Sequence, residues 1–573
     1  MSQKKYRRLR ALEREREAID DKRENLAVQE GFWEIIRKNW TFLLIIGMGV
    51  VLIYLNALHG DFVSDDYASI TQNPDVLNPR VMFSGFNTMR IGTYLLAVIF
   101  GIKNPLGFHL NSLFLYLIFI ILAFAFIYRM FGKKLAISTT LLFAFHPIHV
   151  EAVSWISGRI YIILAIYILL GLMAFIYYLE TGKYKFLGWV ILFFILGFLI
   201  DKPRPFSLIF LMVLVVFYFG WGKVRDKLSK FIPYIITFSI AFFILSIPYI
   251  RSRVAVVNSG YNFSESIFYN PFFQYPTGIA KYLQLLWLPI DLTLYHTMYV
   301  FEPWLNWLIL LLFLAIMWYW GKKDKRYWFA LMFILLALAP SMAPVKVSWL
   351  VAERYMFLGS LGFCLFLALL LEAIDLRIKN LSYLILSLLL VFYGIRVYLR
   401  NIDWQTNHNL WVRTVQYSWN SHNAWNNIGD DYDKLGQYDN AIKGFGQSYA
   451  VKNNYADAYH NQANIFFKIK RYDLARQGYE MALKFHPGLY QSYISLTQVA
   501  LYQGDLNGAL AYANKLIESQ PNNPQAYYVM GVVLAQGGKL KEAEDYLNYA
   551  LQLNPNFTPA VNTLKQISAG KTQ

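Results

Sequence analysis

Apolar residues form long runs up to about residue 400 and follow a sparser, periodic pattern after it. A helix needs about 20 apolar residues to cross a bilayer, and eleven runs approach that length. They lie near 41–58, 106–128, 135–150, 160–179, 185–200, 205–220, 231–250, 304–320, 327–344, 355–371 and 381–399. A further stretch near 276–290 contains Lys281 and Gln284 and ends in Leu-Pro. We expect it to be re-entrant or interfacial, because irregular backbone is tolerated at membrane depth only where protein buries it.

Lys and Arg gather in the connections that follow alternate runs, which orients the predicted spans. Basic clusters occur at 129–134, 183–185, 223–230, 322–326 and 377–379. Such clusters stay on the cytoplasmic side, together with the charged N-terminal segment 1–40. About eleven crossings over 41–400 then place everything after residue 400 outside the cytoplasm.

The last part of the chain, 401–573, repeats with a period of 34 residues. An aromatic residue recurs at Trp425, Tyr459, Tyr493 and Tyr527, and an alanine recurs at 441, 475, 509 and 543. This pattern is typical of tetratricopeptide repeats, here near 422–455, 456–489, 490–523 and 524–557. The sequence thus predicts an all-α protein: a polytopic helical membrane domain followed by an α-solenoid. The solenoid's concave groove would hold a protein partner or would only cap the membrane domain, and we favour the partner.

Composition agrees with this division. The chain is 57% hydrophobic, and its formal net charge is +17. Because the positive charge lies in loops between apolar runs, we expect no nucleic-acid partner. The single cysteine, Cys364, excludes an internal disulfide and a cysteine metal cage.

Two adjacent carboxylates, Asp65 and Asp66, occupy the first predicted outer loop. A carboxylate at that position can act as a general base, and one or both can bind a divalent cation. An ordinary acidic turn outside the bilayer is the plain alternative.

Two further groups of polar residues fall at the same predicted face. The spacing of His146, His149 and Glu151 suits metal ligands or, equally, a packed cluster at a helix end. Cations also lie where apolar runs meet the outer face, at Arg159, Lys202, Arg204 and Arg354. Guanidinium groups bind phosphate bidentately, although snorkelling towards lipid headgroups would also explain each cation alone.

These motifs together resemble a known family. The motifs are Asp65-Asp66 with Asn73-Pro-Asp-Val, the stretch from Phe145 to Val153 that leads to Ser157-Gly-Arg, and Ala352-Glu-Arg-Tyr. Together they are similar to those of the transmembrane and tetratricopeptide-repeat O-mannosyltransferases, which are GT-C glycosyltransferases. The resemblance covers nearly the whole chain. It implies transfer of a sugar, usually mannose, from a polyprenyl-phosphate donor to Ser or Thr hydroxyls of secreted or membrane proteins on the extracytoplasmic side.

The resemblance also assigns roles to residues. Asp66, or else Asp65, would be the base, and the four cations would bind the donor phosphate. The same cleft would be lined by His109, His146, His149, Glu151, Glu353 and Tyr355. If a divalent cation such as Mg²⁺ or Mn²⁺ takes part, its candidate ligands are Asp65, Asp66, His149 and Glu151.

Two departures from the family pattern leave the sugar open. Tyr161 stands where relatives often carry an acidic residue, and Pro203 follows Lys202 where they often have Glu. Two other function classes also remain: a lipid-linked-sugar transferase acting on a glycan or lipid, and a non-enzymatic membrane scaffold. The abundance of Lys, Ile, Asn and Tyr favours a bacterial cytoplasmic membrane as the location.

Overall fold

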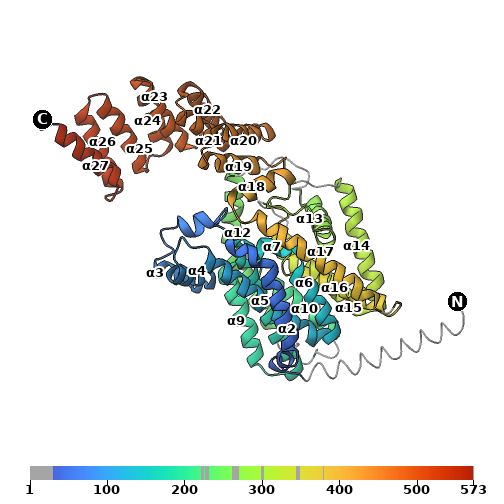
Figure 1. The fold of residues 1–573 in the computed structure, drawn as a ribbon. Helices are drawn as coiled ribbons and strands as arrows, with labels where there is room; N and C mark the ends of the chain where they lie inside the picture. Colours follow the sequence, from blue (N-terminus) through green and yellow to red (C-terminus); the bar gives the residue numbers. More distant parts are fainter. Residues whose placement is uncertain are drawn as a thin grey trace, which may run out of the picture. The chain divides into compact units, whose positions relative to one another are not determined.

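A computed structural model describes residues 30–220, 225, 232–260, 270–297, 302–342, 349–378 and 380–571. The described residues are helical and contain no strand, which confirms the predicted all-α fold. The predicted charged segment 1–40 lies outside the described residues as far as position 29. The chain divides into two compact units, Met1–Arg413 and Thr414–Gln573 (Figure 1). The boundary expected between 400 and 401 falls inside helix α17, because that helix continues to Asp403.

Each apolar run of the first unit overlaps a helix. The helices are α2 (Phe32–Tyr54), α3 (Pro79–Met82), α4 (Thr88–Phe100), α5 (Leu106–Phe131), α6 (Lys133–Phe145), α7 (Val150–Ser154), α8 (Arg159–Thr181), α9 (Lys185–Ile200), α10 (Phe206–Phe219), α12 (Ile232–Gly260), α13 (Pro271–Trp287), α14 (Pro303–Lys323), α15 (Lys325–Leu338), α16 (Ser360–Asp375), α17 (Leu381–Asp403) and α18 (Asn407–Tyr417). Helix α18 spans the boundary between the two units.

Five segments of the described chain are long and apolar enough to cross a membrane. They are Phe32–His59, Leu106–Phe131, Ile156–Thr181, Pro303–Lys323 and Leu381–Asp403. Four shorter apolar helices accompany them, at Thr88–Phe100, Lys185–Ile200, Phe206–Phe219 and Ile240–Ser252. The chain is therefore an integral membrane protein, while the predicted number of eleven crossings stays a prediction.

The run predicted over 135–150 is not one straight helix. Helix α6 ends at Phe145, and the following pieces, Pro147–Ser154, are bent from it by 55°. Pro147 causes the break, because its ring disfavours helical backbone at the preceding residue and His146 is extended, with φ −69° and ψ 126°. The His146 side chain then accepts a hydrogen bond from the Ile148 amide at 3.2 Å. The chain therefore changes direction just before the segment that carries His149 and Glu151.

Helices α5, α6, α8 and α16 make the middle of the first unit. Helix α6 packs against both α5 and α16, and α5 also packs against α8. Aromatic rings pack between these helices. The ring centroid of Phe119 lies 5.1 Å from that of Phe143 and 4.9 Å from that of Phe357. All three side chains are buried. This packed centre supports the loops that carry the polar residues.

The second unit is built from helix pairs. Its helices are α19 (His422–Lys434), α20 (Tyr438–Val451), α21 (Ala456–Lys468), α22 (Tyr472–Phe485), α23 (Tyr490–Tyr502), α24 (Leu506–Ser519), α25 (Pro524–Gln536), α26 (Leu540–Leu553) and α27 (Thr558–Lys571). The turns inside the pairs contain residues with positive φ at the repeat period, at Gly436, Lys470, Gly504 and Gly538. The recurring alanines Ala441, Ala475, Ala509 and Ala543 are fully buried. The 34-residue pattern therefore marks the tight contact within each pair.

Candidate functional site

The Asp66 carboxylate is fully buried at the start of a short π-helical turn, Tyr67–Thr71. One of its oxygens accepts a hydrogen bond from the Val63 amide at 3.1 Å. The other accepts from the Ser157 amide at 2.8 Å and from the Ser157 hydroxyl. Burial raises the pKa of Asp66 to about 6, against the lowering effect of these hydrogen bonds and of Arg159. A carboxylate with that pKa is suited to exchange a proton near neutral pH.

The neighbouring Asp65 lies differently. Asp65 is exposed, and its backbone carbonyl accepts hydrogen bonds from the amide and the hydroxyl of Ser69, at 2.9 and 2.7 Å. The two carboxylates thus have unlike surroundings, one buried and bonded and one facing solvent. A difference of this kind separates the roles of paired acids.

The segment Ser157-Gly158-Arg159 brings a cation to the same place. Gly158 is required there because a Cβ atom would lie 2.5 Å from the backbone oxygen of Glu151. The Arg159 side chain is 1% exposed. Its Nη2 donates to the Thr93 hydroxyl at 2.7 Å, and its guanidinium lies 5.3 Å from the Phe108 ring centroid. Its Nη1 has no hydrogen-bond partner among the described residues.

A pocket of about 390 Å³ opens beside these groups. Its polar lining includes a serine hydroxyl bonded to Asp66, the Arg159 side chain and a second, exposed arginine, Arg90. The full lining is Ser69, Ile70, Asn73, Asp75, Val81, Met82, Met89, Arg90, Thr93, Ser157, Arg159 and Ile160. A buried donor without a partner is costly unless a ligand or water satisfies it. The pocket can therefore accept an anionic or hydroxyl-rich ligand.

Two of the other predicted cations, Arg354 and Arg204, lie beside Tyr161 and Tyr355. Arg354 forms an ion pair with Glu151, and its amide donates to the same carboxylate at 2.8 Å. The guanidinium groups of Arg354 and Arg204 lie 5.0 and 4.9 Å from the Tyr355 ring centroid, and Arg204 is also paired with Asp201.

Two further contacts complete this group. Arg354 donates to the Tyr161 hydroxyl at 3.3 Å. Lys202 lies two residues before Arg204, and its amine is 5.0 Å from the Tyr249 ring centroid. The two arginines are thus held by carboxylates and rings, although Nε of Arg204, like Nη1 of Arg159, has no hydrogen-bond partner among the described residues.

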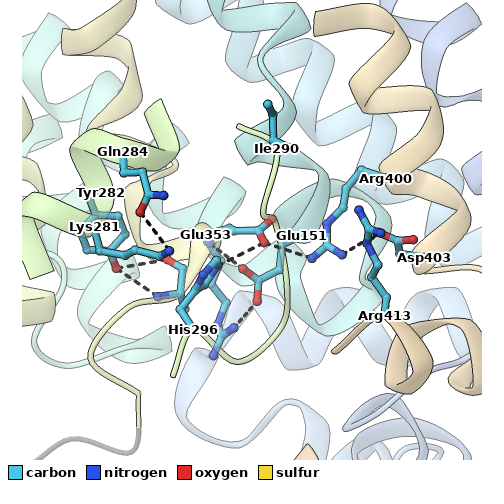
Figure 2. Close-up of polar contacts among 12 residues, drawn as sticks. Glu151, Lys281, Tyr282, Gln284, Ile290, His296, Glu353, Arg400, Asp403 and Arg413 are labelled. Atoms are coloured by element: carbon cyan, nitrogen blue, oxygen red, sulfur yellow. Dashed lines mark hydrogen bonds and ion pairs between the residues drawn. The ribbon is translucent and has the colours of Figure 1, made fainter. Parts of the chain in front are cut away.

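Glu353 belongs to a buried polar network (Figure 2). Its Oε1 lies 3.0 Å from Nη2 of Arg400 and 3.4 Å from Nε2 of His296. Arg400 also contacts Asp403 at 2.9 Å. Burial raises the pKa of Glu353 to about 7 and lowers the pKa of His296 to about 3. The network ties the Glu353-Arg354 segment to the end of α17.

The three predicted histidines make structural contacts. His109 Nε2 lies 3.1 Å from the Gly60 carbonyl oxygen, and His146 Nε2 lies 3.1 Å from that of Leu286. His149 bridges the Ser360 hydroxyl at 2.7 Å and the Tyr116 hydroxyl at 3.0 Å.

The four proposed metal ligands are not brought together. Asp66 is bonded to Ser157, His149 to hydroxyl groups and Glu151 to Arg354. No group of three His, Cys, Asp or Glu side chains in the described part of the chain could hold a metal ion. We therefore derive no step that uses one.

Several residues of the site were not among the sequence candidates. Thr93 is neutral and lies on an apolar helix, where one sequence gives no signal for it, whereas Ser157 belongs to a family motif but was given no role. Arg400 could have been found, since it lies at the end of an apolar run as the four predicted cations do.

The fold and the site define an integral membrane protein with a tetratricopeptide-repeat unit. A family model described as "Tetratricopeptide repeat" matches residues 426–490 and 496–556. Protein O-mannosyl-transferase TMTC3 from Homo sapiens is 23% identical over 90% of this chain and 64% of the relative. TMTC3 from Mus musculus is 24% identical over 88% of this chain and 63% of the relative. The chain is a homologue of these protein O-mannosyl-transferases, which confirms the resemblance.

The chain spans a little less than two thirds of the length of these two relatives. Among solved structures, MamA is similar to it with 19% identity and a TM-score of 0.25, covering 28% of this chain and 94% of MamA.

Proposed function

We propose that this protein is a membrane glycosyltransferase that moves a sugar, with mannose as the first candidate, from a polyprenyl-phosphate donor to Ser or Thr hydroxyls of proteins. The names of the homologous transferases support the reaction class. The observation that carries the proposal is one pocket flanked by a buried carboxylate of pKa about 6 and a guanidinium with a free donor. The chemistry, the active site and the repeats would all lie on the extracytoplasmic side of a bacterial cytoplasmic membrane.

In the proposed reaction the acceptor hydroxyl oxygen attacks the anomeric carbon of the donor sugar. The bond between that carbon and the phosphate oxygen breaks, and the phosphate leaves with the electron pair. Negative charge grows on the leaving phosphate, so a preorganised cation beside it lowers the barrier. Arg159, which lines the pocket, supplies that cation. The attack inverts the configuration at the anomeric carbon.

The proton of the acceptor hydroxyl goes to Asp66. Because Asp66 is fully buried and Ser157 lines the pocket, the proton is passed through the Ser157 hydroxyl. That hydroxyl donates to Asp66 and can accept from the substrate at the same time. Arg204, Arg354 and Lys202 assist in binding the donor phosphate, Arg204 and Arg354 less directly, since each already has a carboxylate partner.

The repeat unit is proposed to hold the protein acceptor. Stacked helix pairs create a long concave surface, and its use as a protein-binding surface agrees with the matched family model. This assignment gives the membrane unit the donor and the repeat unit the acceptor.

The direct test uses full-length protein in detergent, a radiolabelled polyprenyl-phosphate mannose donor and peptides from secreted proteins. The wild-type protein should label Ser or Thr side chains, and Asp66→Asn should abolish the label. Asp65→Asn is the matched control and should retain transfer. Wild-type turnover by Asp66→Asn would disprove the assigned base. A polyprenyl-phosphate glucose donor run in parallel identifies the sugar.

A further inference from the structure

The segment from Arg400 to Asn407, here called the clamp segment, joins the end of α17 to the start of α18. It contacts three separate parts of the site. Arg400 binds Glu353, and Trp404 stacks on Trp155 with 5.7 Å between ring centroids and 23° between planes. Asn407 Oδ1 accepts a hydrogen bond from the Ser64 amide at 2.8 Å. These partners lie beside Arg354, Ser157 and Asp66 respectively in the sequence.

The contact with Ser64 constrains the loop most directly. Ser64 has φ +53°, a left-handed conformation that is costly for a residue other than glycine unless its surroundings hold it. The residue comes just before Asp65-Asp66, and the adjacent Val63 amide donates to the Asp66 carboxylate. A second bond from the clamp segment, in which the Gln405 carbonyl accepts from the Asp61 amide at 2.8 Å, fixes the other end of the same turn.

We propose that Asn407 is a positioning residue, which holds Ser64 in its left-handed conformation and thereby fixes the Asp66 carboxylate against Ser157. This inference rests on the proposed function. Without the side-chain oxygen of Asn407, the Ser64 amide loses its partner, and the turn can relax to an ordinary φ. The relaxation rotates Val63 and Asp66 relative to Ser157, which belongs to another part of the chain. Displacements of about 1 Å in such a group can cost about a hundredfold in rate.

Asn407 acts on the chemical step and not on donor affinity, because it does not line the pocket and its side-chain oxygen bonds to the Ser64 amide. The expected signature is therefore a lower kcat with a nearly unchanged KM for the donor. Any residue that keeps an acceptor oxygen at this position should restore the rate, so Asn407→Asp is the conservative variant.

The experiment compares Asn407→Ala, Asn407→Asp and Asn409→Ala in the full chain. Asn409 is the matched control, since its amide group donates only to the Ile402 carbonyl, at 3.0 Å, within the same stretch of chain. Steady-state transfer gives kcat and KM for the polyprenyl-phosphate mannose donor. Hydrogen–deuterium exchange of a peptide covering 62–70 reports the loop without any substrate.

Asn407→Ala should lower kcat about tenfold or more with donor KM changed less than about twofold, and it should speed exchange in 62–70. Asn407→Asp should restore both quantities, and Asn409→Ala should change neither. Wild-type kcat in Asn407→Ala, unchanged exchange, or an equal loss in Asn407→Asp would each overturn the inference. If the wild-type protein transfers no sugar, the proposed function is wrong, and the exchange measurement still decides whether Asn407 holds the loop.

Discussion

Removing the Ser157 hydroxyl tests the link between Asp66 and the pocket. Asp66 accepts three hydrogen bonds, from the Val63 amide, the Ser157 amide and the Ser157 hydroxyl. Ser157→Ala removes only the last of these, because alanine keeps its amide. Since that bond stabilises the ionised form, its loss raises the pKa of Asp66 above its present value of about 6.

The size of the shift follows from the strength of a hydrogen bond to a charged group. Such a bond contributes about 1.5–3 kcal/mol, and one pKa unit corresponds to about 1.4 kcal/mol. The pKa of Asp66 should therefore rise by about 1 to 2 units. A base works in its ionised form, so transfer increases as pH rises through that pKa. The acid limb of the profile should move from near pH 6 to between about pH 7 and pH 8.

The assay is initial-rate sugar transfer at saturating donor, measured from about pH 5 to pH 9. Ser157→Thr keeps a hydroxyl and should keep the wild-type profile. Thr71→Ala is the control for loss of a hydroxyl in the same loop, since Thr71 donates to the Tyr67 carbonyl at 3.3 Å and not to Asp66. The plateau of Ser157→Ala should also fall, because the proton relay is lost. An acid limb that stays near pH 6 in Ser157→Ala would refute the assignment of that limb to Asp66.

Three other outcomes are expected. Arg159→Gln should lower kcat/KM for the donor by about 10²–10³-fold, far more than Lys202→Gln in the same steady-state assay, and equal losses would contradict a special role for the free Nη1. Glu151→Gln should destabilise the protein by about 3–5 kcal/mol, because it leaves Arg354 buried without its carboxylate. Unfolding followed in detergent should show a smaller loss of stability for the double variant Glu151→Gln/Arg354→Met. Additive losses of stability would argue against the ion pair. Glu353 has a folded pKa of about 7, above its ordinary 4.5. Its contribution to stability is therefore complete below about pH 4.5 and is lost as pH rises through about 7. Glu353→Gln should flatten this fall in unfolding temperature, and parallel curves of unfolding temperature against pH for the variant and the wild type would exclude the effect.

Local patterns in the sequence predicted the elements well. Long apolar runs predicted most helices of the first unit but not α3, α4 and α18, which lie outside those runs. The 34-residue period predicted the helix pairs of the second unit. Both signals come from neighbouring residues in one chain, because a helix presents the same face every three to four positions. The stretch 135–150 was predicted as one run, although Pro147 within it disfavours helical backbone at His146.

The site was less predictable, and the reason lies in contacts between distant segments. The family motifs marked Asp66, Arg159 and Arg354 as candidates. They gave no sign that Arg354 is paired with Glu151 while Arg159 keeps a donor free. Ser157 and Asn407 are neutral polar residues, of which any one sequence contains many, although Ser157 belongs to a family motif. Their importance depends on which backbone amides and carboxylates lie opposite them.

The sequence by itself determined that this is a helical membrane protein with a repeat unit, and it limited the chemistry to a few charged residues at the ends of apolar runs. These properties follow from solvation and helix periodicity, which act along short stretches. Only the tertiary structure decided that Asp66 is buried and Asp65 exposed, and that a segment at the end of α17 holds the Asp66 loop. The physical reason is that burial and hydrogen-bond partners, which set the pKa of a carboxylate, are supplied by residues far away in the chain.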